Sequence, residues 1–279
     1  MAFAAVGRLT ITAADDVQQE LSDIERRVGG RLGVAIVDTR NGQQILHRAN
    51  ERFPMCSTFK LLAAGAVLAR VDRGEERLDR RIAYTSADLL EYAPVTRARV
   101  ADGSMSVVDL AAAAVTVSDN TAGNLLLSTI SGPAGLTAWI RSLGDTVTRL
   151  DRNEPTLNEG APGDPRDTTS PSAIVGSMRK LLVENVLTAS SKQRLIEWMV
   201  ASTTGTALLR SSIPTAWRAG DKSGRGGHGS TNDLGVFWPP DEHPILVASF
   251  VTDSSRDLAE RERALAGIGR IAAAIRARA

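Results

Sequence analysis

The chain contains 279 residues, of which 43% are hydrophobic, and its formal net charge at pH 7 is +1. This length and apolar content suffice for one large domain or for two closely packed domains. A net charge near zero gives no general attraction to nucleic acid or to an anionic membrane, so we expect neither as a partner. Cys56 is the only cysteine and the three histidines lack metal-ligand spacing, so the sequence predicts no metal site.

The beginning of the chain does not have the features of a complete export signal. Met1–Gly7 is apolar, but it is short and no basic segment precedes it. No other stretch approaches the roughly 20 apolar residues that a membrane-spanning helix needs. We therefore expect either that a signal peptide has been removed or that the protein is cytoplasmic.

The first elements predicted are two helices with a hairpin between them. Apolar residues recur at helical spacing over Asp16–Val28. Leu32–Asp38 and Gln44–His47 predict antiparallel strands, because a turn that ends in Asn-Gly separates them. Thr58–Val71 is apolar on nearly every side, which is typical of a buried helix.

The rest of the chain divides at Arg149–Pro171, a segment dense in proline, glycine, aspartate and asparagine. Helical patterns continue on both sides of it to about Met199, so we interpret the segment as a long irregular loop, a kind that is often functional. Three strands are then predicted, followed by a final helix over Leu258–Ile275. The three strands cover Trp217–Ser223, Asp233–Trp238 and Ile245–Thr252.

Strands therefore occur at both ends of the chain, and helices fill the middle. The predicted fold class is α/β, more strictly α+β: a five-stranded antiparallel sheet flanked by the terminal helices, plus an all-helical domain. Residues 1–52 and 201–279 would form the discontinuous α/β domain. Residues 53–200 would form the helical domain, including the long loop at 149–171.

One motif combines a hydroxyl with an amine. In Ser57-Thr-Phe-Lys60 the two groups would share a helix face, because residues three apart are neighbours there. A buried, neutral lysine can activate a serine as a nucleophile, and burying a lysine in so apolar a helix is costly without a task. The pattern recurs at Ser177-Met-Arg-Lys180, where two adjacent basic residues predict a solvated helix face. We therefore take Ser57, and not Ser177, as the candidate nucleophile.

Three further motifs offer polar groups, and each also has an ordinary structural interpretation. Ser118-Asp-Asn120 offers a hydroxyl for proton relay and an amide for a substrate carbonyl, or else simply ends a helix. Lys222-Ser-Gly224 offers a cation and a hydroxyl to a substrate carboxylate, or else forms a glycine turn after a strand. Glu154-Pro-Thr-Leu-Asn158 offers a carboxylate and an amide to one water molecule, or else forms a surface turn in the long loop.

Two other functional interpretations are excluded or poorly supported. Gly224–Gly229 matches the dinucleotide-binding pattern Gly-x-Gly-x-x-Gly, but that pattern requires a helix to follow it. Thr231–Pro240 instead predicts a strand that ends in prolines, which excludes dinucleotide binding. A histidine-based catalytic triad is poorly supported, because no Gly-x-Ser-x-Gly occurs.

The order and spacing of the four motifs strongly resemble those of class A serine β-lactamases. The resemblance covers roughly residues 17 to 275 and extends to the residues around the motifs: Phe53–Lys60, Asn120–Leu127, Leu150–Asn158 and Pro162–Thr168. It implies hydrolysis of β-lactam antibiotics through a serine acyl-enzyme, in an active site between the two domains. It also implies that no metal or cofactor is needed, that the protein is a monomer, and that it is periplasmic or secreted.

The resemblance also assigns the catalytic roles. Ser57 would be the nucleophile, Lys60 its buried partner and Ser118 the proton relay to the leaving nitrogen. Glu154, with Asn158, would activate the hydrolytic water from a loop of the omega type. Whether Lys60 or Glu154 is the base for acylation is not decided by the sequence.

Substrate binding would involve a second set of residues in the same cleft. These are Tyr92, Asn120, Asn158, Lys222, Ser223, Gly224 and Arg225. The backbone N–H groups of Ser57 and Arg225 would form the oxyanion hole. The resemblance further implies a cis Glu154–Pro155 bond and an ion pair between Arg152 and Asp167.

The chain departs from the family pattern at several positions. Ser223 replaces the commoner threonine, and Arg225 stands where the family usually has a small residue. Cys56 resembles a disulfide cysteine of some members, but the expected partner position is Gly226. Thr231 stands where many members have an arginine that binds the substrate carboxylate. Lys222 and Ser223 could bind this carboxylate alone, or an arginine could compensate: Arg225, Arg261 or Arg263, with Arg210 a weaker candidate.

Two alternatives to a β-lactamase share parts of this motif set. A penicillin-binding DD-peptidase has the serine, lysine and Lys-Ser/Thr-Gly elements but lacks the glutamate loop. A β-lactam-sensing domain would bind the drug without turnover. The presence of Glu154 and Asn158 at family spacing argues against the DD-peptidase.

Overall fold

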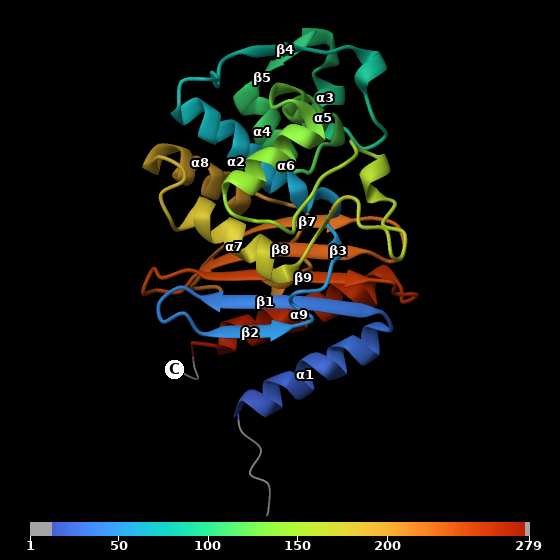
Figure 1. The fold of residues 1–279 in the computed structure, drawn as a ribbon, viewed down its shortest axis with the longest axis vertical. Helices are drawn as coiled ribbons and strands as arrows, with labels where there is room; N and C mark the ends of the chain where they lie inside the picture. Colours follow the sequence, from blue (N-terminus) through green and yellow to red (C-terminus); the bar gives the residue numbers. More distant parts are fainter. Residues whose placement is uncertain (1–12, 277–279) are drawn as a thin grey trace, which may run out of the picture.

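Five antiparallel strands form one sheet in the order β2-β1-β9-β8-β7 in the computed structural model, which describes residues 13–276. Met1–Gly7 lies outside the described residues. All five strands were predicted: β1 Arg31–Asp38, β2 Gln44–His47, β7 Arg218–Arg225, β8 Thr231–Trp238 and β9 Ile245–Thr252. The chain leaves the sheet after β2 and returns to it with β7, so the sheet joins two distant parts of the sequence (Figure 1).

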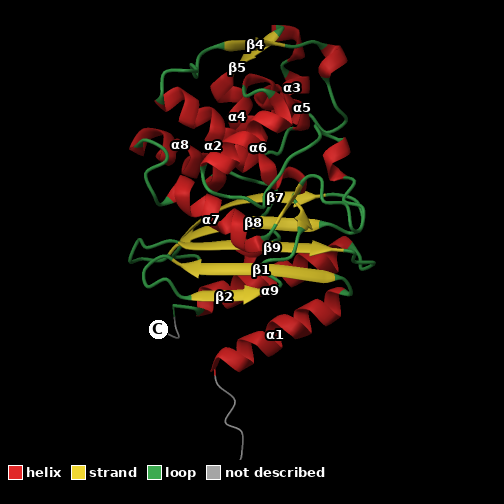
Figure 2. Cartoon of the chain, viewed as in Figure 1, coloured by secondary structure: helices red, strands yellow, loops and turns green. Residues whose placement is uncertain are grey.

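The two faces of the sheet are covered by different helices. Side chains alternate along a strand, and Leu32, Val34 and Ile36 of β1 pack in one apolar cluster with α1 Ala13–Val28 and α9 Leu258–Ala274. Ala35 and Val37 belong to the other cluster, which also contains α7 Pro171–Leu182. Figure 2 shows the sheet as a layer with most of the helices on the side away from α1.

The helical part is built around α2 Phe59–Asp72. Residues 59–69 of this helix are all buried, as expected from its apolar sequence. The surrounding helices are α3 Pro94–Ala98, α4 Val107–Thr116, α5 Asn120–Thr129, α6 Gly132–Ser142, α7 and α8 Ala189–Val200. A buried α2 fixes the position of any residue in its first turn.

The prediction of a purely helical middle section is wrong in detail. Two small two-stranded sheets lie within it, β3 Phe53–Pro54 with β6 Thr168–Thr169, and β4 Arg81–Ala83 with β5 Ser104–Ser106. Strands of two or three residues are too short to show an alternating pattern in the sequence. The pairing of β3 with β6 has a structural consequence, because it attaches the end of the long loop to the segment before Ser57.

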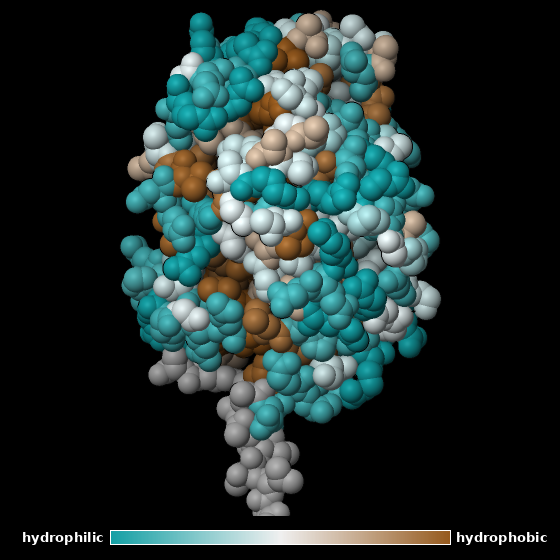
Figure 3. Space-filling model, in the orientation of Figure 1, coloured by the Kyte–Doolittle hydropathy of each residue, from teal (hydrophilic) through white to brown (hydrophobic). Residues whose placement is uncertain are grey.

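The face of the molecule drawn in Figure 3 is mixed in character. Hydrophilic residues cover most of the face shown in Figure 3, and hydrophobic residues are visible between them in patches. Among the helices of residues 13–276, none has both the length and the apolar character needed to cross a bilayer.

Candidate active site

Ser57 lies in a short 3-10 turn, Cys56–Thr58, that leads directly into α2. Its exposed fraction is only 8%, and the turn packs against β7 and β8. Lys60, in the first turn of α2, is fully buried and donates a hydrogen bond from Nζ to Ser57 Oγ over 3.0 Å. The predicted serine–lysine contact is therefore present, although the serine precedes the α-helix instead of starting it.

Lys60 Nζ is the point at which several predicted residues meet. It donates to the Ser118 carbonyl oxygen over 2.8 Å and to Asn120 Oδ1 over 2.6 Å, and it lies 3.0 Å from Glu154 Oε1. Burial lowers the pKa of Lys60, and the adjacent Glu154 carboxylate opposes this shift. Gly123 provides the space for the lysine, since a Cβ atom there would lie 2.9 Å from Lys60 Cε.

Glu154 reaches the nucleophile from the long loop. Its buried carboxylate accepts a hydrogen bond from Ser57 Oγ over 3.1 Å and another from Asn158 Nδ2. Asn124 of α5 fixes the Glu154 backbone, because its amide donates to the carbonyl and accepts from the N–H, each over 2.9 Å. Sequence analysis did not single out Asn124, which lay within a segment similar to the family and carried no other signal.

A buried aspartate, Asp167, closes the long loop. Arg152 Nε lies 2.6 Å from Asp167 Oδ2, while Oδ1 accepts hydrogen bonds from the backbone N–H groups of Asp151 and Arg152. The Glu154–Pro155 bond is cis. Both predictions for the loop are therefore confirmed, and the loop has a defined position beside Ser57.

Lys222 enters the site from the sheet. It is fully buried on β7 and donates from Nζ to Ser118 Oγ over 3.0 Å, so this hydroxyl lies between Lys222 and Lys60. Burial and the positive charge of Lys60 lower the pKa of Lys222 to about 7. Asp119, the middle residue of the Ser118-Asp-Asn120 motif, is not hydrogen-bonded to either lysine. It accepts hydrogen bonds from the N–H groups of Val95 and Thr96.

Ser223 and Gly224 follow Lys222 on β7. Ser223 Oγ donates to Thr204 Oγ1 over 2.7 Å, and Thr204 was not predicted as a site residue. A Cβ atom at Gly224 would lie 2.9 Å from the Met55 carbonyl oxygen and 3.1 Å from the Ser57 nitrogen. The absence of a side chain at Gly224 therefore allows β7 to approach the turn that carries the nucleophile.

Tyr92 and Asn120 belong to the helical part of the chain, where Asn120 is the first residue of α5. The Tyr92 side chain is 50% exposed, and the Tyr92 carbonyl accepts a hydrogen bond from the Asn120 backbone N–H over 3.0 Å. An exposed aromatic ring next to a site residue is available to contact a ligand.

The candidate arginines occupy different places. Arg225 lies at the end of β7, with Nη2 2.7 Å from Glu262 Oε1 and Nη1 3.5 Å from the Thr204 carbonyl oxygen. Arg263 lines a hollow with residues of α1, and Arg261 Nε donates back to its own helix at the Asp257 carbonyl.

Arg210, the weaker candidate, has a structural role. It forms an ion pair with the buried Asp221 and donates to the carbonyl oxygens of Met199 and Ser202. Of the four candidates, Arg225 is therefore the one that contacts Thr204, the hydrogen-bond partner of Ser223.

Two further expectations concern Cys56 and Ser177. A Cβ atom at Gly226 would lie 2.7 Å from Cys56 Sγ, so Gly226 is indeed the position that faces the cysteine. The prediction that Ser177 lies on a solvated helix face is wrong: the residue is buried and donates to Asp145 Oδ2 over 3.1 Å. The buried carboxylate draws the serine inward, and it lies in a different hydrogen-bond network from that of Ser57.

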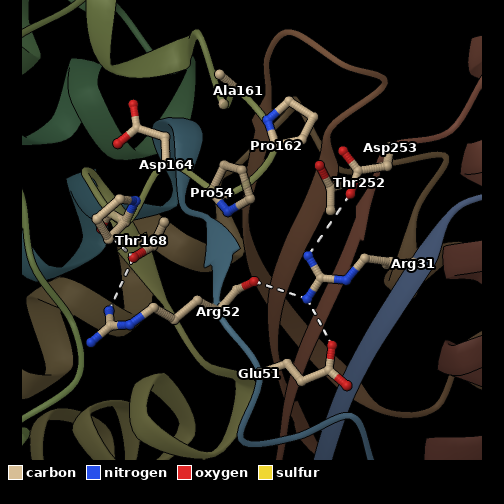
Figure 4. A pocket seen from close by; sticks show the side chains of 13 residues that line it. Arg31, Glu51, Arg52, Pro54, Ala161, Pro162, Asp164, Thr168, Thr252 and Asp253 are labelled. Atoms are coloured by element: carbon tan, nitrogen blue, oxygen red, sulfur yellow. Dashed lines mark hydrogen bonds and ion pairs between the residues drawn. The ribbon is translucent and has the colours of Figure 1, made fainter.

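A hollow of about 290 Å³ lies between the long loop and the ends of β1 and β9, and Figure 4 shows the side chains that line it. None of the predicted catalytic or substrate-binding residues lines it. Two arginines line it: Arg31 is neutralised by Glu51 at 2.8 Å and Asp253 at 3.8 Å, and Arg52 donates to the Val147 carbonyl and the Thr168 hydroxyl at its edge. We therefore assign the catalytic site to the Ser57 network and not to this hollow.

Comparisons with known proteins agree with the geometry. A model of the β-lactamase enzyme family matches residues 16–278. The chain is 42% identical over 259 residues to β-lactamase OXY-2 of Klebsiella oxytoca, covering 93% of this chain and 89% of that protein. It is 43% identical over 258 residues to β-lactamase CTX-M-8 of Citrobacter amalonaticus, covering 92% and 88%.

Solved structures give the same result. An ancestral class A β-lactamase is 54% identical, with a TM-score of 0.90, over 93% of this chain and 98% of that one. A putative class A β-lactamase, PenP from Rhodopseudomonas palustris, is 48% identical, with a TM-score of 0.89, over 96% and 100%. The chain therefore belongs to the class A serine β-lactamases.

The pKa of Lys222 predicts a pH dependence. Lys222 is cationic below a pH of about 7 and loses its charge above it, so kcat/KM for an anionic penicillin should fall as the pH rises through 7. Lys222→Arg keeps its charge throughout this range, so the same decline should be absent from its profile. An identical decline in both proteins would show that another group causes it.

The Asn124 bridge predicts an effect on catalysis from a residue that does not touch the nucleophile. Asn124→Ala removes two hydrogen bonds that fix Glu154, together worth about 1–3 kcal/mol, so kcat should fall about 5- to 150-fold. Ser128→Ala, an exposed change on the same helix, serves as the control. Steady-state kinetics of both variants test this, and an unchanged kcat in Asn124→Ala would contradict the positioning role.

Proposed function

We propose that this class A β-lactamase hydrolyses β-lactams through an acyl-enzyme on Ser57, which a water activated by Glu154 then hydrolyses. The observation that carries the proposal is the position of Ser57 Oγ, which lies 3.0 Å from Lys60 Nζ and 3.1 Å from Glu154 Oε1. A serine hydroxyl with a base at hydrogen-bond distance has the arrangement of an activated nucleophile.

In acylation, Ser57 Oγ attacks the lactam carbonyl and its proton passes to a base of the network. Lys60 and Glu154 both lie within hydrogen-bond distance of Oγ, so either can take the proton. The backbone N–H groups of Ser57 and Arg225 stabilise the oxyanion in the proposal. The C–N bond then breaks, and the nitrogen receives a proton through Ser118, whose hydroxyl contacts both lysines.

In deacylation, Glu154 takes a proton from a water molecule that attacks the acyl carbonyl. Asn158 holds the same carboxylate and leaves its own Oδ1 without a protein partner among the described residues. A buried acceptor of this kind is suited to a second contact with that water. The ester bond to Ser57 breaks, and Oγ regains a proton from the network.

The substrate carboxylate is assigned to the β7 side of the site. Lys222 and Ser223 offer the cation and the hydroxyl, and Arg225 adds a guanidinium next to Thr204, the partner of Ser223. The substrate carboxylate would share this guanidinium with Glu262, which lies 2.7 Å from it. The amide side chain of the substrate would contact Asn120, with Tyr92 at the edge.

Steady-state turnover of nitrocefin is the first test, because a DD-peptidase or a sensor would give only a stoichiometric burst.

The nucleophile assignment predicts a contrast between two serines. Ser57→Ala should lower kcat by several orders of magnitude, as expected for a covalent nucleophile, because no other group can form the acyl bond. Ser177→Ala should leave kcat nearly unchanged, since Ser177 bonds to Asp145 and not to the catalytic network. Full nitrocefin activity in Ser57→Ala would overturn the proposal.

The role of Glu154 predicts a trapped intermediate. Glu154→Ala removes the base for the second step, so a penicillin should remain bound to Ser57 and add its mass to the protein. Intact-protein mass spectrometry detects this adduct. Normal turnover would refute the role of the loop, and absence of both adduct and turnover would place Glu154 in the acylation step.

The position of Arg225 predicts its effect on substrate binding. Arg225→Ala should lower kcat/KM for a penicillin about 10- to 150-fold, because a hydrogen bond between charged groups is lost. Arg261→Ala and Arg263→Ala remove the same charge from α9, where Arg261 contacts the Asp257 carbonyl and Arg263 lines a hollow with α1, so they should change kcat/KM less than about threefold. If Arg225→Ala also stays within that limit, Lys222 and Ser223 bind the carboxylate without an arginine.

A further inference from the structure

A second pocket lies away from the Ser57 network, between α6 and the beginning of the long loop. Its volume is about 610 Å³, and three arginines line it: Arg52, Arg141 and Arg149. None of the predicted catalytic or substrate-binding residues takes part. The pocket is therefore a separate feature of the surface.

Two of these arginines are without an acidic partner. Neither Arg52 nor Arg141 lies within 4.0 Å of a carboxylate oxygen of the described residues. Arg149 does have one, since it binds both carboxylate oxygens of Asp151. Two adjacent guanidinium groups without a counter-charge are unfavourable unless an anion or water screens them.

The backbone of one turn brings the two unpaired guanidinium groups together. Arg52 Nη1 donates to the Val147 carbonyl over 2.8 Å, and Arg141 Nη1 donates to the Asp145 and Thr148 carbonyls over 2.6 and 2.5 Å. Figure 4 shows that the Arg52 side chain extends away from Arg31 towards Thr168, to which it also donates. Carbonyl contacts orient both groups but do not neutralise them.

The nearby carboxylate of Asp145 does not neutralise these arginines. It faces inward and accepts hydrogen bonds from the N–H groups of Val147 and Thr148 and from the Ser177 hydroxyl. Among the described residues, the Nη2 and Nε atoms of Arg52 and Arg141 donate no hydrogen bond to protein. Four oriented donors on two cations thus remain available to a ligand.

We propose that this pocket binds a soluble ligand of the phosphate or pyrophosphate class. Planar guanidinium groups bind tetrahedral oxyanions through paired, charge-assisted hydrogen bonds, and these are strongest when the donors are held in place beforehand. The volume exceeds the needs of a single phosphate, and Leu150 and the alanines of α6 add an apolar wall. The proposal is independent of the catalytic one, because the two sites share no residue.

Thr146 provides a test that leaves the arginine contacts intact. It is an exposed residue of the pocket, and none of the arginine hydrogen bonds involves it. Thr146→Glu places a negative charge among the arginines, while Thr146→Gln adds a neutral side chain of the same size. Isothermal titration with pyrophosphate at low salt should show one site in the natural chain and in Thr146→Gln, and at least about tenfold weaker binding in Thr146→Glu.

The other outcomes overturn the proposal. Absence of binding to the natural chain, or equal binding by the two Thr146 variants, would mean that the arginines only support the turn at 145–148. Pyrophosphate bound in the catalytic cleft instead would slow nitrocefin turnover and would not respond to Thr146→Glu. Nitrocefin turnover by both variants confirms that they are folded, and Arg141→Gln supplies a second weakening variant.

Discussion

A buried cation beside a buried carboxylate is the interaction on which the rest of this site depends. The side chains of Lys60 and Glu154 are both 0% exposed, and their charged atoms lie 3.0 Å apart. Removing two charges from water costs several kcal/mol for each, so an apolar pair of similar size would serve stability as well or better. The pair is explained by its chemistry instead, because both groups reach Ser57 Oγ.

The fold supplies each member of this network from a different rigid element. The buried helix α2 carries Lys60, the junction of α4 and α5 carries Ser118, the clamped loop carries Glu154, and the central part of β7 carries Lys222. Hydrogen bonds to neighbouring backbone hold the loop in place at Asn124 and Asp167. The donors and acceptors are thus fixed before a substrate arrives, which is what electrostatic stabilisation of a transition state requires.

The sequence predicted the elements and motifs whose signals are local. The five strands of the main sheet and the buried α2 have clear periodicity, and motif spacing brought Ser57, Lys60 and Glu154 into one proposal. Beyond what the motifs implied, the sequence did not predict contacts between residues that are far apart in the chain. The short pairing of β3 with β6 has no period, and Asn124 resembles any helical asparagine. Ser177 is buried where it meets Asp145, a residue of another segment.

The protonation state of Lys60 tests most directly whether the buried Lys60–Glu154 pair serves the chemistry at Ser57. The chain has only four lysines, so carbon-13 labelling of the lysine Cε atoms gives few NMR signals, and Lys60→Ala identifies one of them. Burial beside the site predicts that Lys60 titrates below the ordinary lysine value of about 10.4. A Lys60 signal that titrates at or above that value would contradict the claim that burial destabilises the charged form of Lys60, and it would leave Glu154 as the base that takes the Ser57 proton.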